Sequence, residues 1–408
     1  MVALLPLIAG SQCLYTQAMK WDLGKIYAFK FFDDLVLVYP FYILLFVESG
    51  LSATEVSSLL IAWSVVTFVL EIPSGVLADR VPRKYVLIAG QLARALSFGI
   101  WIFWPTFTGF LIGVVLWGVK SACTSGTFQA LVYDLLKSDN EEASYAKVIG
   151  RARTASYIGV LVAAGLASVA IAYGYTFVLV ASAAAVALSA LSIALVSAAP
   201  AFQSTHEKDY VSIATAGFCF LYTRQALLLL ILFMALFHAQ YLGIEEFFPI
   251  LMTLDGATKS TIALMGIAFG VAQALASLLA HRFERFATFG IGLFMVLEGA
   301  FYVGAYYLAG IPSFAALVIA SAMHTIFFTL YDARVQHTLD SGTRATVSSV
   351  QGLLTEGSAV LFYIVFGLGA GALGYSEAFF WFSLWVFGLG FLYLASQMFW
   401  RKEVSYTK

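Results

Sequence analysis

The sequence predicts an all-α integral membrane protein with twelve transmembrane helices in two pseudo-symmetric six-helix bundles. Of the 408 residues, 61% are hydrophobic and only 11% are charged, whereas about a quarter of the residues in a soluble domain are charged. Twelve apolar runs are each long enough to cross a bilayer, which takes about 20 helical residues. Two short motifs also recur about 200 residues apart, as expected for a duplicated bundle.

We expect a leader, two bundles joined by a cytoplasmic linker, and a cytoplasmic tail. Residues 1–23 are expected to form the leader. No cation precedes Lys20, so the segment lacks the charged start of a signal peptide, and its apolar stretch is too short for a span. The remaining predicted parts are the first bundle 24–198, the linker 199–224, the second bundle 225–400 and the tail 401–408. The expected spans are approximately 24–47, 54–77, 85–105, 107–136, 147–173, 175–197, 225–251, 260–282, 287–309, 312–336, 346–371 and 375–400.

The internal repeat involves two pairs of motifs with nearly the same offset. Tyr133-Asp134, near the end of the fourth predicted span, recurs as Tyr331-Asp332 near the end of the tenth. The other pair is Leu77-Ala78-Asp79-Arg80 with Arg83, which recurs as Leu279-Ala280-His281-Arg282 with Arg285. Because His281 replaces Asp79, any lock based on this carboxylate is expected to be strong in the first half and weak or pH-sensitive in the second.

Cations gather on one side of the predicted spans, while the opposite loops contain little beyond Lys259. By the positive-inside rule, the crowded side is cytoplasmic. This places the Asp79 loop, the linker and both termini in the cytoplasm, and the protein in the cell inner (plasma) membrane. The cations on this side include Lys137, Lys147, Lys208, Arg224, Arg282, Arg285, Arg334, Arg344, Arg401, Lys402 and Lys408.

The loop between the second and third predicted spans, GVLADRVPRKYVL from Gly75 to Leu87, carries a specific motif. It resembles the loop signature that joins helices 2 and 3 in the major facilitator superfamily, except that Pro82 stands where the family usually has Gly. The resemblance implies a twelve-helix transporter that works by alternating access, with its substrate site near the membrane midplane between the halves. It also implies a role in gating for this loop. The predicted gating residues are Gly75, Asp79, Arg80, Arg83 and Lys84, together with Glu71 and Glu356.

Two charge pairs on the cytoplasmic side form a predicted latch. Asp134 precedes Arg151, and Asp332 precedes Arg344 in the matching place of the second half. Opposite charges at these positions can pair when the inner side is closed and separate when it opens. The alternative is that the arginines only anchor helix starts at the membrane surface.

Ionisable residues inside membrane spans are costly and therefore indicate function. Asp33 and Asp34 lie about nine residues into the first span. Two adjacent carboxylates repel when both are ionised, which favours proton binding by one of them. Lys120 in the fourth span is a plausible countercharge, so we assign Asp33, Asp34 and Lys120 to proton coupling. The alternative is a structural ion pair. Arg94 is expected to extend back toward the cytoplasm.

The predicted substrate-binding residues come mainly from the second half. His238 and His324 lie in the seventh and tenth spans, the counterparts of the first and fourth, although buried histidines also serve in packing. Glu245 and Glu246 are candidates for an outer carboxylate site, with simple solvation as the alternative. Aromatic candidates are Tyr42 and Phe327. Glu298, in a helix that the resemblance makes peripheral, is predicted to be a hydrogen-bonded packing residue.

The preferred function is a secondary active transporter, with proton-coupled export of a small amphipathic organic molecule such as a drug, siderophore or metabolite. Proton-coupled uptake is the alternative, since span 5 lacks the exporters' central Pro, and a non-transporting receptor or assembly protein is a further one. The sequence has no phosphate-binding Gly-Lys-Ser/Thr loop and no His-Glu-x-x-His motif, so we predict no enzymatic activity, catalytic residue, cofactor or metal. The expected partners are the small-molecule substrate, protons and lipid, without nucleic acid, and the protein is expected to be a monomer.

Overall fold

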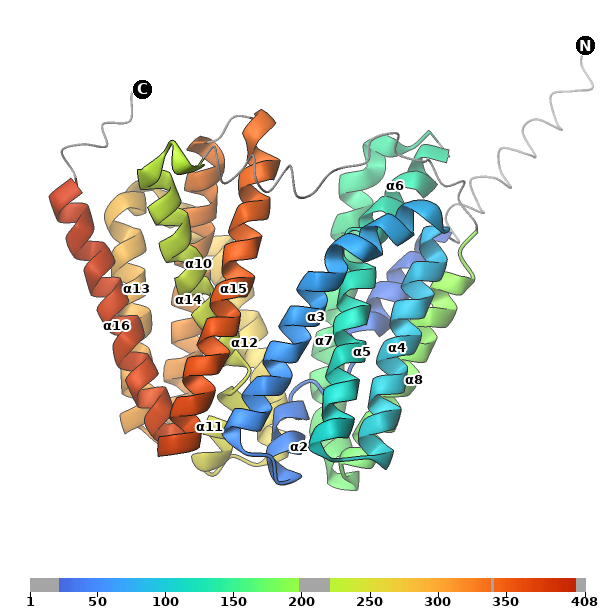
Figure 1. The fold of residues 1–408 in the computed structure, drawn as a ribbon, viewed down its shortest axis with the longest axis horizontal. Coiled ribbons are helices and arrows are strands. Elements are labelled where there is room, and N and C mark those ends of the chain that lie inside the picture. The colour runs from blue at the N-terminus through green and yellow to red at the C-terminus, as the bar shows by residue number, and fades with distance from the viewer. Residues whose placement is uncertain (1–21, 139, 198–220, 339–340, 401–408) are drawn as a thin grey trace, which may run out of the picture. The chain divides into compact units, whose positions relative to one another are not determined.

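The computed structural model describes residues 22–138, 140–197, 221–338 and 341–400, which form helices joined by short turns (Figure 1). Most of the predicted leader and linker, and all of the predicted tail, lie outside these ranges. By packing, the described residues divide into two compact units. The first unit holds residues 22–39 and 62–197, and the second holds residues 40–61 and 221–400. Apart from a few residues at the predicted leader and linker boundaries, the predicted domains differ from these units in the segment Pro40–Ile61, which packs with the helices from α10 onward.

The first unit is organised around α4, which packs against both α5 and α8 (Figure 1). The buried stripe of α4 repeats every three to four residues, as expected for one helix face, and it includes the polar residues Gln91 and Arg94. Polar groups on this face need partners inside the unit. The elements of the unit are a helix over 22–34, α3 (Ala53–Arg80) from Ala62 onward, α4 (Arg83–Phe103), α5 (Phe107–Thr124), α6 (Thr127–Ser138), η1 (Glu142–Ser144), α7 (Tyr145–Ala170), η2 (Ile171–Tyr173) and α8 (Tyr175–Ala194).

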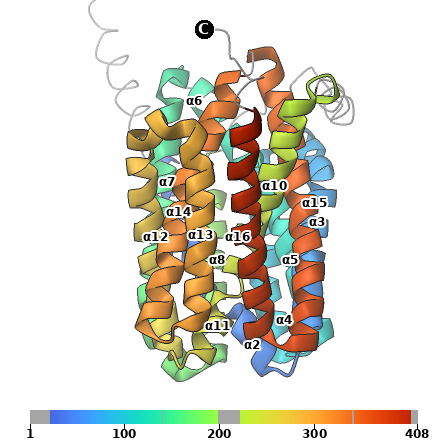
Figure 2. The same ribbon diagram turned by 90° about the vertical axis from the view of Figure 1, so that its left-hand side faces the viewer.

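The second unit is organised around α13, which packs against α14 and α16, while α10 packs against α15 and α12 against α14 (Figure 2). The start of α3, up to Ile61, also belongs to this unit. The other elements are α2 (Tyr42–Glu48), α10 (Gln225–Glu245), α11 (Phe248–Leu254), α12 (Lys259–Ala280), η3 (His281–Phe286), α13 (Ala287–Tyr307), α14 (Ile311–Thr338), α15 (Ser341–Leu373) and α16 (Tyr375–Trp400).

The membrane-protein prediction is confirmed. Ten helices in the described ranges are long and apolar enough to cross a bilayer, and a further apolar helix covers Ile291–Tyr307. The internal repeat also reappears in backbone geometry. Gly174, before α8, has a φ of 91°, and Gly374, before α16, has a φ of 90°. A positive φ is readily adopted only by glycine, so the two halves use the same turn at corresponding positions.

Three predicted spans prove to be interrupted rather than continuous. The span predicted over 24–47 stops at residue 34 and resumes as α2, after a stretch that contains Pro40. The fourth span breaks at Gly126, whose φ is 70°. The seventh breaks between α10 and α11, where Pro249 stands in the first turn of α11. Proline and glycine favour such breaks because proline lacks an amide donor and glycine tolerates a positive φ. Irregular backbone at membrane depth is tolerated where protein buries it or where it borders a cavity.

Candidate functional site

A buried carboxylate, Asp33, lies at the centre of the first unit with its side chain 1% exposed. The Nζ atom of Lys120 lies 2.7 Å from Asp33 Oδ1, and the Nζ atom of Lys30 lies 3.0 Å from Oδ2. Arg94 Nη1 lies 3.3 Å from Oδ1 and donates to the Asp33 backbone carbonyl at 2.9 Å. Gln91 Nε2 donates to Oδ1 at 2.9 Å. Asp33 therefore accepts from three cationic side chains and one amide.

Asp34 occupies the more accessible edge of the same cluster, with its side chain 26% exposed. Its carboxylate accepts a hydrogen bond from Ser156 of α7, and Lys30 Nζ lies 3.6 Å away. We call Lys30, Asp33, Asp34, Arg94 and Lys120 the aspartate cluster. With two carboxylates against three cations, its formal charge is +1. A group that carries net charge inside a membrane protein responds strongly to a proton or to a charged ligand.

Small residues allow the helices of the cluster to approach. A side chain at Gly159 of α7 would overlap the carbonyl oxygen of Phe31, so glycine lets α7 bring its polar face against the helix over 22–34. A Cβ atom at Gly90 of α4 would lie 3.0 Å from the Cβ atom of Cys123, which indicates an equally close approach of α4 to α5. The guanidinium carbon of Arg94 lies 4.7 Å from the centroid of a Trp117 ring, a distance typical of a cation–π contact.

The structure brings together all three predicted proton-coupling residues and adds four further side chains, which are Lys30, Gln91, Arg94 and Ser156. Lys120 pairs with Asp33, as predicted, while their role in coupling stays a prediction. The prediction for Arg94 is wrong, because its side chain is 2% exposed and lies against Asp33 rather than extending to the surface. Lys30 and Gln91 were not singled out. Lys30 is three residues before Asp33, a spacing that places both on one helix face, and this signal could have revealed it.

In the second unit, His238, His324 and Glu298 form a hydrogen-bonded chain across α10, α14 and α13. His238 Nδ1 lies 2.9 Å from His324 Nε2. His324 Nδ1 lies 3.1 Å and 3.2 Å from the two Glu298 carboxylate oxygens. The Glu298 side chain is 1% exposed. We call these three residues the histidine chain. Glu298, predicted to be a hydrogen-bonded packing residue, is thus bonded to a predicted substrate-binding residue.

Aromatic rings fix the planes of both histidines. The Tyr241 ring stacks on His324 with centroids 3.8 Å apart and an interplanar angle of 14°. The Phe328 ring stacks on His238, also with centroids 3.8 Å apart. Phe327 has no exposed surface and contacts the His324 ring edge-on at 4.7 Å. In this conformation Phe327 therefore supports His324 rather than facing an open surface.

The predicted carboxylates Glu245 and Glu246 have separate partners. Gln273 of α12 donates to Glu245 at 3.3 Å and also to the Tyr241 hydroxyl at 2.8 Å. Glu246 accepts a hydrogen bond from the hydroxyl of Tyr42. Both carboxylates are half-buried. The structure therefore joins Tyr42 to Glu246, two residues that the sequence analysis assigns to substrate binding on separate grounds.

A three-residue charge network joins the end of α3, the start of α4 and α6. Arg83 Nη2 lies 3.5 Å from Asp79 Oδ1, and the Arg83 guanidinium also pairs with Asp134 of α6. Asp79 is 52% exposed, whereas the side chains of Arg83 and Asp134 are 10% and 8% exposed. Lys84 donates to the Val196 carbonyl at 3.3 Å. In this structure the buried contact of the network is therefore between Arg83 and Asp134.

The other predicted gating residues lie outside this network or cannot be placed in it. Arg151 is exposed, and Asp134 pairs with Arg83 in this structure. The Asp134–Arg151 latch therefore stays a prediction. Arg344 lies outside the residues whose side chains are described, so its pairing with Asp332 is also untested. Glu71 and Arg80 are exposed, and Gly75, Asp332 and Glu356 are half-buried.

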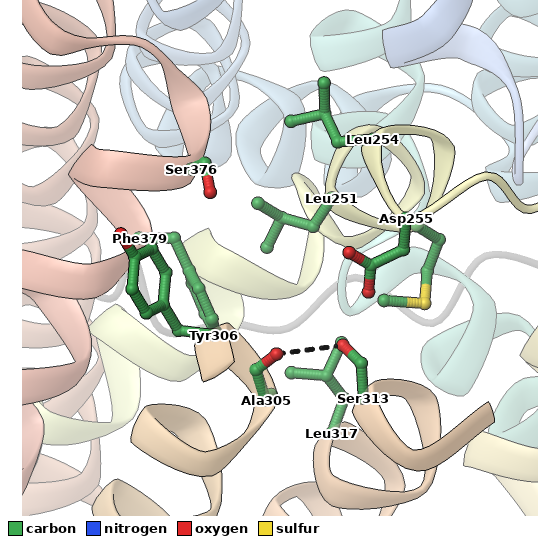
Figure 3. Close-up of a pocket in the computed structure, with 10 residues that line it drawn as sticks. Leu251, Leu254, Asp255, Ala305, Tyr306, Ser313, Leu317, Ser376 and Phe379 are labelled. Carbon is green, nitrogen blue, oxygen red and sulfur yellow. Dashed lines mark hydrogen bonds between the residues drawn. The ribbon is translucent and has the colours of Figure 1, made fainter. Parts of the chain in front are cut away.

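A small cavity of about 30 Å³ lies among α11, α13, α14 and α16 (Figure 3). Asp255 and Tyr306 line it, and Ser313 donates to the Ala305 carbonyl at 3.0 Å beside it. One water molecule needs about 10–15 Å³ of such volume, so this cavity has room for water but not for an organic ligand. Within the described ranges, no three His, Cys, Asp or Glu side chains are grouped in a way that could hold a metal ion.

Comparison with known proteins identifies the family. A family model described as the Major Facilitator Superfamily matches residues 26–363. No curated protein matches the chain. The solved structure of the nucleoside transporter NupG is 14% identical, with a TM-score of 0.75 over 93% of this chain and 98% of that chain.

Two further solved structures are also similar. A bacterial homolog of the human lysosomal transporter Spinster, in an inward-facing and unoccupied conformation, is 16% identical, with a TM-score of 0.71 over 95% of this chain and 98% of that one. A D-xylose–proton symporter is 14% identical, with a TM-score of 0.65 over 93% and 96%. At these identities the likeness concerns the fold alone. Because the family model spans most of the chain, the protein belongs to the Major Facilitator Superfamily and is a multi-pass secondary transporter rather than an enzyme.

Proposed function

We propose that the protein couples proton movement to the export of a small amphipathic organic molecule by alternating access. In this proposal it works as a monomer in the cell inner (plasma) membrane, with both termini in the cytoplasm. It needs no cofactor. The observation that carries the proposal is the aspartate cluster, in which Asp33 is buried among Lys30, Arg94 and Lys120.

The cluster suits coupling because its ion pairs join three helices. Asp33 and Lys30 are on the helix over 22–34, Arg94 is on α4 and Lys120 is on α5. A proton or a charged ligand that changes the charge of the cluster changes the attraction among these helices. Asp34, as the more exposed carboxylate, is the group through which protons exchange with the surroundings. The charge state of the cluster is thereby linked to the packing of its helices.

The network around Arg83 supplies the gate in this proposal. Asp79 and Asp134 hold Arg83 from two elements, so breaking either contact loosens the loop between α3 and α4 from α6. His281, which starts η3, replaces Asp79 in the second copy and hydrogen-bonds to the Leu278 carbonyl of the preceding α12 at 2.7 Å. A carboxylate lock is therefore proposed for the first half only.

The substrate is proposed to contact the residues around the histidine chain. His238 offers a half-buried stacked ring, while Tyr42, Glu245 and Glu246 offer a hydroxyl and carboxylates. His324 stacks against His238, and Phe327 packs against His324, so these two buried residues support the proposed binding surface. Aromatic faces beside a few polar groups suit an organic molecule that has both apolar and polar parts.

The first experiment identifies a ligand and then measures flux. Thermal unfolding of the purified protein against a chemically diverse panel reveals ligands that stabilise the folded state. Proteoliposomes with an imposed pH gradient should then show ligand-dependent proton movement. Asp33→Asn and Asp34→Asn should reduce this movement, whereas Glu142→Gln, at an exposed position outside the cluster, should not. Unchanged proton flux in both aspartate variants would contradict the proposed coupling.

Proton-coupled uptake is the second candidate. It is favoured by α7, which runs from Tyr145 to Ala170 without a proline, whereas the exporters that the loop resembles carry a central proline in the matching helix. Vesicles of known protein orientation distinguish the two directions. A proton gradient directed into the cytoplasmic side should drive the ligand in the opposite direction for export, and in the same direction for uptake.

A further inference from the structure

We infer that Glu298, His324 and His238 form a binding site for one transferable proton, which enters and leaves at His238. The site lies in the second unit and is separate from the aspartate cluster, which belongs to the first unit. The inference deepens the proposed coupling and rests on it only for the role of this proton in transport. Proton binding itself is argued from the local geometry.

The first step concerns the charge of Glu298, whose side chain is 1% exposed. Among the described residues its one ion-pair partner is the His324 imidazole, whose side chain is 3% exposed. This differs from Asp33, which has three cationic neighbours. An ionised carboxylate that is buried without a cation is very costly, so such a group holds a proton or faces a partner that does. The Glu298–His324 pair therefore carries no net charge in this conformation, whether the additional proton lies on the carboxylate or on the imidazole.

The second step concerns the hydrogen bonds of the loaded chain. The protonated Glu298 carboxyl donates its O–H to His324 Nδ1, and His324 Nε2–H donates to His238 Nδ1. His238 then carries its remaining proton on Nε2. All three side chains are neutral in this state. A neutral group crosses between differently solvated states of a transporter at a lower cost than a charged one.

The third step concerns release. When the Nε2 proton leaves His238, the His324 Nε2 proton moves to His238 Nδ1 and the Glu298 proton moves to His324 Nδ1. The result is one carboxylate and two neutral imidazoles, with one proton fewer and a charge of −1. Both hydrogen bonds persist with their directions reversed. The distances of 2.9 Å and 3.1 Å allow both directions without movement of the rings.

Accessibility gives the chain a direction. His238 is half-buried, whereas His324 and Glu298 are buried. The stacked rings of Phe328 and Tyr241 hold the two imidazoles in place. The outer end of the chain is therefore His238 and the inner end is Glu298.

The other titratable groups near the chain do not replace Glu298. From α10 these are Tyr241 and Glu245, and from α13 Tyr302. The Tyr241 hydroxyl bonds to Ser321 of α14 and Gln273 of α12, and Glu245 also bonds to Gln273. From α16 the rings that contact Tyr302 are Phe379 and Phe382. None of these groups is a cation, so in this described set only a neutral hydroxyl, that of Tyr302, lies close enough to favour the ionised form of Glu298.

The test uses infrared spectroscopy on the purified full-length protein in lipid nanodiscs, with no transported ligand. Difference spectra across a pH titration should show a carboxylic-acid carbonyl band that belongs to Glu298. The band should disappear in E298Q and remain in D33N and in the surface control E142Q. Circular dichroism checks that each variant is folded. Identical bands in wild type and E298Q would overturn the inference.

A second variant tests the order of the chain. His238→Gln removes the half-buried ring at the outer end of the chain while leaving Glu298 and His324 in place. The Glu298 band should persist, but its exchange after a pH jump should slow at least tenfold. Unchanged exchange would exclude entry at His238. Because neither measurement involves transport, a protein that fails to couple proton flux to a ligand can still pass this test, and the two proposals can fail independently.

Discussion

The ammonium group of Lys120 lies 2.7 Å from the Asp33 carboxylate, and both side chains are nearly excluded from solvent. The contact joins α5 to the helix over 22–34. It is nevertheless one of three cationic contacts that Asp33 makes. Removing Lys120 leaves Asp33 with two cations, whereas removing the Asp33 carboxylate leaves three cations without it.

This inequality predicts a difference in stability between Lys120→Met and Asp33→Asn. Lys120→Met lowers the formal charge of the aspartate cluster from +1 to 0, and Asp33 keeps Lys30 and Arg94. Asp33→Asn raises the charge to +2 and leaves cations without their partner. Removing one side of a buried pair costs about 3–5 kcal/mol. We expect thermal unfolding of purified protein to show this loss for D33N and a clearly smaller loss for K120M. A larger loss in K120M would contradict the charge assignment.

Arg94→Lys tests whether the shape of the guanidinium matters. Arg94 reaches both the Asp33 carbonyl and the carboxylate while stacking over Trp117, and a lysine cannot make all three contacts. We expect a loss of about 1–3 kcal/mol in unfolding free energy from the charged hydrogen bond. Arg80→Lys, at an exposed position, is the matched control. Equal behaviour of the two variants would show that charge alone suffices at position 94.

The Arg83 network predicts unequal effects for its two carboxylates. Asp134→Asn removes a partner that is 8% exposed, whereas Asp79→Asn removes one that is 52% exposed. Exposed ion pairs contribute about 0–1 kcal/mol, while disrupting a buried pair costs about 3–5 kcal/mol. Thermal unfolding should therefore show D134N as the less stable variant. The effect of D79N should shrink in high salt, and that of D134N should not.

Asp22 gives a pH-dependent prediction at the edge of the first predicted span. Burial raises its pKa, but hydrogen bonds from Lys25 and Ser197 outweigh this and hold the pKa of Asp22 below its usual value. A lowered folded-state pKa adds stability at pH values above the unfolded pKa of about 3.9, and this stability is lost as the pH falls through the folded pKa. Asp22→Asn should lower the unfolding temperature near pH 7, and its difference from wild type should shrink in acid. A difference that is the same at both pH values would contradict this assignment.

Coupled transport is predicted to depend on Glu298 as well as on the aspartate cluster. In E298Q the histidine chain cannot become anionic by the proposed release step, because glutamine cannot release a proton. We expect exchange of ligand across proteoliposomes to continue without a gradient, while uphill movement driven by pH is lost. Glu377→Gln is a useful control, since Glu377 is exposed and bonds to Tyr306 rather than to the histidine chain. Full gradient-driven transport in E298Q would show that Glu298 is not needed for coupling and would leave the aspartate cluster of the first unit as the proposed coupling site.

Much of the helical architecture could be predicted because length and hydropathy determine membrane spans. The last span, predicted over 375–400, matches α16 at Tyr375–Trp400. The breaks in spans 1, 4 and 7 were harder to predict, because each lies within a long and mostly apolar run. Only Pro40, Gly126 and Pro249 marked these places, and proline or glycine also occurs inside unbroken helices, as Pro73 does in α3.

The candidate site could be predicted only in part, because contacts between distant residues leave no local pattern. The sequence indicates that Asp33 needs a countercharge and offers Lys120. It does not indicate that Arg94, 61 residues from Asp33, turns inward. A long side chain near the end of a span can equally extend to the surface, and the choice depends on how closely α4 approaches its neighbours. Glu298 is predicted to be a packing residue because the resemblance makes its helix peripheral, and its bond to His324 of another helix leaves no local pattern.

Lys30 has a consequence for the order in which the chain is made. Asp33 enters the membrane before α4 and α5 have been synthesised, so neither Arg94 nor Lys120 is yet available to neutralise it. Lys30 lies on the same helical face, 3.0 Å from Asp33 in the folded protein, and the pair can form within a single nascent helix. Removing Lys30 should therefore reduce the yield of inserted protein more than the stability of protein that has already folded. Lys30 therefore serves mainly during membrane insertion, whereas Arg94 and Lys120 stabilise Asp33 in the folded bundle.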